Sequence, residues 1–338
     1  MTRWIHPVSV DVPASFSSLN LPPLIAQTLV RRGFTTPESA RAFLQPDSTP
    51  IPFPNIEPAL DRILLAIRSQ ERICVWGDFD VDGQSSTALL VQTLRSLGGN
   101  VVYYITIRGK ESHGVHVESL QPILDRGVTL IVTCDTGITA HAAIEYANSR
   151  GVDVVVTDHH DLGETLPNAK AIVNPKLLDD GHTLKNLAGV GVAYKLAEAL
   201  IGSDDFSVLT EVVTTDVLLD LVALGLIADV ALLKGETRAL AQKGIQRLRH
   251  TDRLGLKLIA ELSGTNLETL TEETIGFTFA PRLNALGRLS DANPAVELLL
   301  TQDSARARVL ATQVRGEERR DACAVRGGVV RMQVDVPG

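Results

Sequence analysis

Cysteine is scarce in this sequence, with three residues among 338. An odd number without paired spacing fits neither a disulfide scaffold nor a structural zinc site. The three are Cys74, Cys134 and Cys323, and the first two stand inside apolar, strand-like runs. We therefore expect buried, reduced thiols that behave as small hydrophobic side chains.

Long hydrophobic runs are also missing. The apolar stretch from Leu218 to Ile227 is interrupted by Asp220 and is far shorter than a bilayer-spanning helix. The N-terminus carries Arg3 and His6 followed by Pro and Ser residues, without the apolar core of a signal peptide. These absences predict a cytoplasmic protein without a membrane segment.

An excess of basic residues is absent as well. The chain has 32 Lys and Arg against 40 Asp and Glu, which gives a formal net charge of −8. Proteins that neutralise nucleic-acid phosphates usually present a basic face, and this balance does not favour one. If the ligand is a nucleic acid, local arginines or bound metal ions must overcome the overall charge.

Two widespread catalytic or nucleotide-binding patterns are missing too. No nucleophilic Ser or Cys constellation stands out, and the sequence has no phosphate-binding Gly-Lys loop. Gly189-Val190-Gly191 lacks the third glycine of a dinucleotide-binding fingerprint. Any catalytic activity is therefore expected to depend on other kinds of residues.

The hydrophobic fraction of 44% is sufficient for a real core and for one large or two ordinary domains. Residues 1–55 predict a small helical cap, with helix starts at Pro22-Pro23 and at Thr36-Pro37, followed by a proline-rich connector. Residues 56–302 predict the main domain. Residues 303–338 predict the start of a connecting helix and then a charged, aperiodic tail after Arg315.

The main domain begins with alternating strand and helix patterns. The expected strands are 72–78, 101–107, 130–134, 152–157 and 171–173, with helices at 85–97, 117–126 and 140–150. The following half is mostly helical, with helices expected at 190–201, 206–227, 234–249 and 254–262. Strands that are apolar throughout and joined by helices predict an α/β fold, with a parallel sheet covered by helices on both faces.

Three carboxylates stand at alternate positions where the first apolar strand ends, namely Asp78, Asp80 and Asp82. Like charges this close call for a divalent cation, because without one their pKa values would rise. A calcium loop of the EF-hand type is an alternative, but Leu89 occupies the twelfth position, where a glutamate is required. A solvated acidic turn is the simpler alternative.

Two further motifs also follow apolar strands. Asp135 precedes Gly137 in the segment Thr133 to Gly137, which by itself fits an ordinary turn or helix start. Asp158 is followed by the adjacent pair His159-His160. One imidazole of such a pair can bind a metal ion while a carboxylate fixes its tautomer.

The three motifs together are more informative than each alone. Ligand sites of open α/β sheets lie beyond the carboxyl ends of the strands, so these side chains should converge at one edge. An oxygen-rich site with one or two imidazoles suits Mn²⁺ or Mg²⁺ better than structural zinc. Two such ions can clamp a phosphoryl group while one activates a water molecule.

These segments resemble the motifs of the DHH phosphoesterase superfamily. The resemblance rests on Asp80-Val81-Asp82-Gly83, Asp135-Thr136-Gly137, Asp158-His159-His160 and the segment Asp220 to Val230. Further stretches are similar to the RecJ branch of single-strand exonucleases. They are Arg31-Arg32-Gly33, Leu187 to Ala193 and Pro281 to Leu289.

The resemblance implies 5′ to 3′ hydrolysis of single-stranded DNA with two Mn²⁺ or Mg²⁺ ions, in DNA repair and recombination. It implies, as possible partners, a single-strand-binding protein or a helicase. It assigns metal binding to Asp80, Asp82, Asp135, His159 and Asp220, with Asp135 bridging the ions. Catalytic support would come from His160, Asp158 and Asp78, with Asp158 orienting His159. Substrate contacts or bracing would come from Arg282, Asn284, Arg288 and His113.

Two departures from that family matter. Its members often carry a Gly-Tyr-Gly-like segment where this chain has Ser112-His113-Gly114, which leaves the role of His113 open. RecJ enzymes also continue into further domains, whereas here the sequence after Gln313 becomes aperiodic, as expected for a truncated or frameshifted reading frame. We therefore expect metal binding with weakened DNA hydrolysis.

Two other functions stay open from the sequence. One is hydrolysis of oligoribonucleotides or of small phosphodiester or pyrophosphate substrates. The other is a non-catalytic module that binds a replication or repair partner. Retention of every expected carboxylate and of both histidines favours an enzyme.

Overall fold

The computed structural model describes residues 8–46, 49–107, 111–203, 214–289 and 292–314, with side chains at 286–289 excepted. The helix expected over 206–227 falls partly outside this range, as does the expected aperiodic tail after Arg315. Within the described residues, no helix is both long enough and apolar enough to cross a bilayer.

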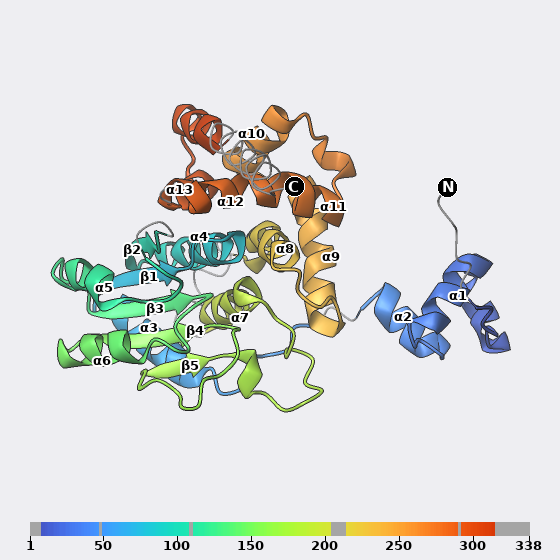
Figure 1. Ribbon diagram of the computed structural model, residues 1–338, viewed down its shortest axis with the longest axis horizontal. Coiled ribbons are helices and arrows are strands. Elements are labelled where there is room, and N and C mark those ends of the chain that lie inside the picture. Colours follow the sequence, from blue (N-terminus) through green and yellow to red (C-terminus); the bar gives the residue numbers. More distant parts are fainter. Residues whose placement is uncertain (1–7, 47–48, 108–110, 204–213, 290–291, 315–338) are drawn as a thin grey trace, which may run out of the picture.

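A five-stranded, fully parallel sheet forms the centre of the molecule, as predicted (Figure 1). Its order is β2-β1-β3-β4-β5. The strands are β1 (Arg72–Gly77), β2 (Asn100–Ile105), β3 (Leu130–Cys134), β4 (Asp153–Thr157) and β5 (Ala171–Val173). Because all strands are parallel, the residues that follow β1, β3 and β4 meet at one edge.

Alternate residues of each strand enter two different cores, because side chains of a strand point to opposite faces. Ile73 and Val75 of β1 belong to the larger core, whereas Cys74 and Trp76 belong to the smaller one. The helices that contribute to the larger core include α3 (Glu57–Arg68), α4 (Val81–Ser96), α7 (Gly189–Ile201) and α8 (Leu219–Ala228). The smaller core is closed by α5 (Val117–Leu124) and α6 (His141–Ser149).

The C-terminal half is helical, as predicted. It contains α9 (Gly235–Arg249), α10 (Leu254–Ser263), the π-helical segment η6 (Ile275–Phe279), α12 (Ala280–Leu289), α13 (Asn293–Leu300) and a helix at 304–314. One expected boundary was wrong. The expected single helix over 206–227 does not include Thr214, which is extended, and α8 starts after a 3-10 turn at Thr215–Leu218. The β-branched pair Thr214-Thr215 is a poor helix former, and Thr214 takes the N-cap position of the turn without a side-chain hydrogen bond.

The N-terminal helix α2 (Pro37–Leu44) lies next to α9, and α1 (Pro23–Arg31) lies beyond α2, both away from the sheet (Figure 1). Thr36 caps α2 in a capping box with Ser39. Together with a 3-10 turn at Ala14–Leu19, these helices enclose a small core of their own around Phe16 and Leu29.

Candidate metal centre

The first acidic motif lies in the tight turn between β1 and α4. Asp80 is the N-cap of α4, where its side chain accepts a hydrogen bond from Gly83 N at 3.0 Å. A Cβ at Gly83 would lie 2.4 Å from the carbonyl oxygen of Asp78, so only glycine permits this turn. Asp78 and Asp82 are buried in consequence, at 2% and 1% exposure.

Asp82 is held by the N-terminus of α7. Its two carboxylate oxygens accept hydrogen bonds from Gly189 N at 2.6 Å and from Val190 N at 2.9 Å. Backbone N–H groups at a helix start stabilise a negative charge there. This contact gives the segment Leu187 to Ala193 a physical role that its sequence did not reveal, since the motif holds a protein carboxylate.

Asp135 follows β3 in a strained backbone conformation. Its φ is +60°, which a non-glycine residue adopts rarely and at a cost. The side chain is 2% exposed, and Gly189 packs so closely that a Cβ there would lie 2.6 Å from Cβ of Asp135. The strain places the carboxylate between the first motif and the histidine pair.

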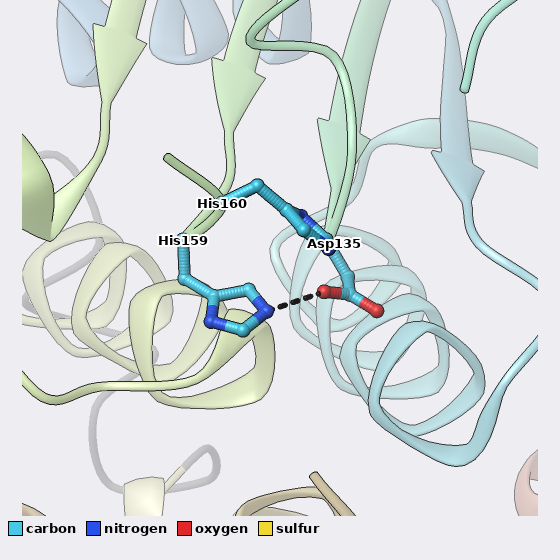
Figure 2. Close-up of side chains that lie close together, drawn as sticks. All are labelled: Asp135, His159 and His160. Atoms are coloured by element: carbon cyan, nitrogen blue, oxygen red, sulfur yellow. Dashed lines mark ion pairs between the residues drawn. The ribbon is translucent and has the colours of Figure 1, made fainter. Parts of the chain in front are cut away.

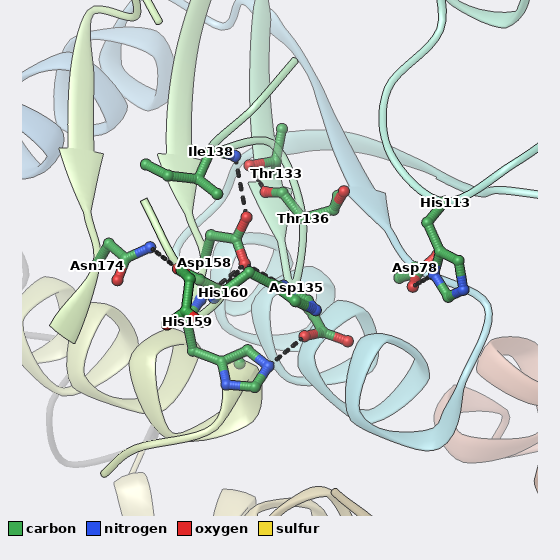
Figure 3. A network of polar contacts seen from close by, with 12 residues as sticks. Asp78, His113, Thr133, Asp135, Thr136, Ile138, Asp158, His159, His160 and Asn174 are labelled. Atoms are coloured by element: carbon green, nitrogen blue, oxygen red, sulfur yellow. Dashed lines mark hydrogen bonds and ion pairs between the residues drawn. The ribbon is translucent and has the colours of Figure 1, made fainter. Parts of the chain in front are cut away.

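The two adjacent histidines have opposite surroundings. His159 Nε2 points at Asp135, 3.1 Å from Oδ1 (Figure 2), and its Nδ1 lies 3.9 Å from Asp229 Oδ2. His160 Nδ1 instead lies 2.7 Å from Oδ1 of Asp158 (Figure 3). Asp158 was expected to orient His159, but the ring that its carboxylate holds is that of His160. Asp158 contacts the ring of His160 and only the backbone N–H of His159.

The pKa values of the two imidazoles move in opposite directions. Burial, followed by the nearby charge of His160, lowers the pKa of His159 to about 4. The hydrogen bond to Asp158 raises the pKa of His160 to about 9. At neutral pH, His159 is therefore neutral and able to bind a metal, whereas His160 is cationic.

The structure corrects the predicted ligand Asp220. Both of its oxygens face Arg253 Nε, at 2.9 and 3.0 Å, and Oδ2 accepts a hydrogen bond from Thr251 at 2.6 Å. It lies in the first turn of α8, whereas Asp229 caps the other end of that helix. Nine residues of helix separate the two by about 13 Å. Asp229 is the acid that lies with His159 and Asp82.

The sequence analysis did not predict Asp229, because two acids flank the same apolar helix and the sequence does not show which end of it meets the strand ends. The available signal was its position at the end of an apolar run, which Asp78, Asp135 and Asp158 share. Packing of α8 against the site also needs Gly225, where a Cβ would lie 2.7 Å from Oδ1 of Asp82.

The predicted substrate residues take different places. Asn284 braces the first motif, since its Oδ1 accepts a hydrogen bond from Val81 N at 3.1 Å. Arg282 Nη1 donates to the carbonyl oxygen of Thr278 at 2.6 Å, within its own helical segment. His113 joins the acidic site through Asp78, with 2.6 Å between Nδ1 and Oδ2. The side chain of Arg288 lies outside the described residues.

The carboxylates repel one another in the absence of a counter-ion. Burial and then the charge of Asp82 raise the pKa of Asp135 far above its usual value. Burial and then the charge of Asp229 do the same to the pKa of Asp82. Burial and then the charge of Asp80 raise the pKa of Asp229 to about 6. Without a cation, the site therefore reduces the repulsion between its carboxylates by binding protons. A bound cation would remove the same repulsion.

Two buried carboxylate oxygens of the site also lack a hydrogen-bond donor. They are Oδ1 of Asp78 and Oδ1 of Asp135, the latter facing His159 without hydrogen-bond geometry. Buried polar atoms without a partner are rare and point to an ion or a water molecule. Three overlapping sets have ligand atoms within 4.8 Å of one another. They are Asp78/Asp80/Asp135, Asp82/His159/Asp229 and Asp135/His159/His160.

The chemistry of this donor set fits Mn²⁺ or Mg²⁺. Carboxylate oxygens dominate, with a neutral imidazole and without a thiolate among the clustered atoms of the described residues. Asp135 lies in a set with Asp78 and Asp80, and on its other side its Oδ1 lies 3.1 Å from Nε2 of His159, which belongs to a set with Asp82 and Asp229. The residues present would therefore hold two ions around Asp135.

Comparison with known proteins agrees with this geometry. Residues 72–226 match the model of the DHH family, N-terminal domain. The chain is 45% identical to the single-stranded-DNA-specific exonuclease RecJ of Bacillus subtilis over 92% of its own length. A structure of exonuclease RecJ bound to manganese superposes with a TM-score of 0.76 at 34% identity, over 85% of this chain and 71% of that one. The chain belongs to the RecJ family.

A second RecJ structure, from Thermus thermophilus in complex with Mn²⁺, covers 95% of this chain with a TM-score of 0.81 at 32% identity. This chain spans 39% of the Bacillus subtilis RecJ and 46% of the Thermus RecJ. The family match includes the motifs at Asp78 to Asp82, Asp135 and Asp158 to His160, and it ends three residues before Asp229.

Proposed function

We propose that this RecJ-family chain hydrolyses phosphodiester bonds of single-stranded DNA from the 5′ end, using two Mn²⁺ or Mg²⁺ ions, in DNA repair and recombination. One observation carries the proposal. Carboxylates from the ends of β1 and β3 and from the end of α8 cluster with His159, which follows β4, and two of their buried oxygens have no donor. The polarity and the DNA substrate follow from the family and not from the geometry.

Each residue has a defined part in this proposal. Asp78, Asp80, Asp82, Asp135, His159 and Asp229 would hold the two ions. Bound there, the ions would supply a water of lowered pKa and would offset charge on the phosphate. His160 stays cationic at neutral pH, and its Asp158 contact at Nδ1 leaves Nε2 to donate to a phosphate oxygen. Asp82 keeps its place because α7 binds both of its oxygens.

The chain's environment and partners are further parts of the proposal. A cytoplasmic enzyme of this kind would meet its strand coated by a single-strand-binding protein or released by a helicase. The net charge of −8 disfavours long DNA contacts by this chain alone, so such partners would also deliver substrate. Hydrolysis of oligoribonucleotides or small phosphodiesters is the alternative that the same metal site would permit.

The first experiment is Mn²⁺-dependent release of nucleotides from single-stranded DNA labelled at its 5′ end. We expect release by the wild-type chain and at least about a hundredfold less by Asp135→Ala, because one charged ligand shared by both ions is lost. Asp125→Ala is the matched control, because Asp125 pairs with Arg150 on the surface. Absence of release despite Mn²⁺ binding would contradict the proposal, and preference for RNA of the same sequence would favour the alternative.

A further inference from the structure

His113 is an exposed aromatic side chain that is nevertheless held in place. The side chain is 65% exposed, yet Nδ1 lies 2.6 Å from Oδ2 of Asp78. Its ring packs on Phe79, with 4.3 Å between ring centroids and 46° between ring planes. Both anchors are buried, Asp78 at 2% and Phe79 at 4% exposure. The imidazole has therefore already lost the rotamer freedom that a ligand would otherwise have to remove.

The position of His113 is as informative as its rigidity. Asp78, Asp80 and Asp135 lie together, and the histidine pair lies on the other side of Asp135 (Figure 3). His113 is thus at the end of the acidic row opposite His160. A phosphate placed over Asp135 would extend one of its attached nucleosides toward His113.

We propose that the exposed face of His113 stacks on the nucleobase next to the scissile phosphate. This inference rests on the proposed function. A flat ring can stack on any base, so the contact is tolerant of sequence, as an enzyme that removes successive nucleotides requires. Stacking also needs no charge on the imidazole. It uses the face of the ring, while the bond to Asp78 occupies Nδ1 in the plane.

Two substitutions separate stacking from positioning of Asp78. His113→Phe keeps a ring against Phe79 but removes the bond to Asp78. His113→Asn keeps a donor within reach of Asp78 but removes the ring. The substrates are a normal oligonucleotide and two that carry a single abasic site, placed on one side or the other of the scissile phosphate.

We expect His113→Asn to lower kcat/KM about tenfold on the normal strand, as loss of one stacking contact predicts. This loss should disappear on one of the two abasic strands, because that strand has no base at the position that stacks on His113. His113→Phe keeps the ring, so its loss on the normal strand should be less than half as large as that of His113→Asn. Equal losses by His113→Asn on all three strands, or a loss by His113→Phe as large as that by His113→Asn, would overturn the inference.

A binding measurement distinguishes failure of stacking from failure of the proposed function. The probe is a short single strand with 2-aminopurine next to the scissile phosphate, bound with Ca²⁺ so that the strand stays intact. Its fluorescence should be quenched by the wild type and by His113→Phe, but not by His113→Asn. Quenching without any hydrolysis under Mn²⁺ would refute the proposed function alone. Hydrolysis without quenching by the wild type would refute stacking alone.

Discussion

At the scale of single residues, neighbouring side chains of the same type acquire different chemistry from their surroundings. His159 is buried among carboxylates and neutral, whereas His160 is half-exposed, bonded to Asp158 and cationic. The two acids of α8 differ in the same way. Asp220 is neutralised by Arg253, and Asp229 has no such cation among the residues that the structure describes. Residue identity alone therefore does not assign a ligand.

The contrast between the two acids of α8 gives the first prediction. Asp229→Asn should weaken Mn²⁺ binding at least about tenfold with little effect on metal-free stability. Asp220→Ala should leave Arg253 buried without its partner and destabilise the fold by about 3 kcal/mol. Titration calorimetry with Mn²⁺ and urea unfolding in EDTA measure the two effects. Reversed roles, with Asp220→Ala abolishing binding in a stable protein, would restore Asp220 as the ligand.

The raised carboxyl pKa values give a prediction about pH. Burial and the charge of Asp80 raise the pKa of Asp229 to about 6, whereas the unfolded chain releases this proton near pH 4. Without metal, the stabilisation from this proton is therefore lost as pH rises through about 6. Because Mn²⁺ replaces the proton, the increase in Tm caused by Mn²⁺ should be larger at pH 7.5 than at pH 5.

The control for this prediction is Asp229→Asn, which has no proton to release at that position. Its Mn²⁺-induced change in Tm should be smaller and should depend less on pH than that of the wild type. Differential scanning calorimetry at several pH values measures both proteins. A Mn²⁺ effect on the wild type that shrinks as pH rises would contradict the argument.

At the scale of elements, helix ends and glycines build the site as much as the ligands do. The start of α7 supplies two N–H groups to Asp82, and α8 approaches closely enough to bring Asp229 to His159. Both approaches need glycine. A Cβ at Gly225 would lie 2.5 Å from Oγ of Ser85, and one at Gly189 would lie 2.8 Å from Oδ1 of Asp135.

Gly189→Ala should therefore harm both stability and metal binding. The added methyl group must displace Asp135 or the start of α7, at a cost of about 1–3 kcal/mol typical of overpacking. Mn²⁺ affinity should fall together with the urea midpoint. Gly276→Ala is the matched control, because a Cβ there has Ile227 as its nearest neighbour at 4.0 Å. Unchanged Mn²⁺ affinity in Gly189→Ala would show that α7 does not position the ligands.

At the scale of the whole molecule, we propose that the N-terminal helices form a separate unit of the kind predicted for residues 1–55. They have their own small core and meet α9 through Phe43. The guanidinium of Arg238 lies 3.9 Å from the centroid of the Phe43 ring, and its Nε donates to the Phe43 carbonyl oxygen at 2.6 Å. The metal centre uses none of these residues.

Phe43→Ala should loosen this attachment without affecting Mn²⁺ affinity. Loss of the contact with Arg238 should lower the free energy of detaching the cap by about 1 kcal/mol. Proteolysis of the cap should then be about fivefold faster. Limited proteolysis followed by mass spectrometry measures the rate. Arg41→Ala is the control, since its partner is Ser18 within the same unit. Loss of Mn²⁺ binding in Phe43→Ala would show that the cap and the metal centre are coupled.

The sequence by itself determined the parallel sheet and the grouping of most side chains of the candidate metal centre. Apolar strands separated by helices specify the sheet, and parallel strands bring Asp78, Asp135 and Asp158 to one edge wherever the intervening helices pack. The prediction of this sheet depends only on the local pattern of apolar residues along the sequence. The acids and histidines at the strand ends could therefore be identified without coordinates.

Only the tertiary structure decided which acid of α8 lies with Asp82 and His159, and which histidine ring Asp158 contacts. The choice between the two histidines depends on how the loop after β4 turns. The choice between the two acids depends on how α7 and α8 pack, through partners that are distant in sequence. Asp220 meets Arg253 and Asp82 meets Gly189 through contacts that span 33 and 107 residues. Local patterns carry no signal for such pairs, because burial and close packing fix them only in the folded chain.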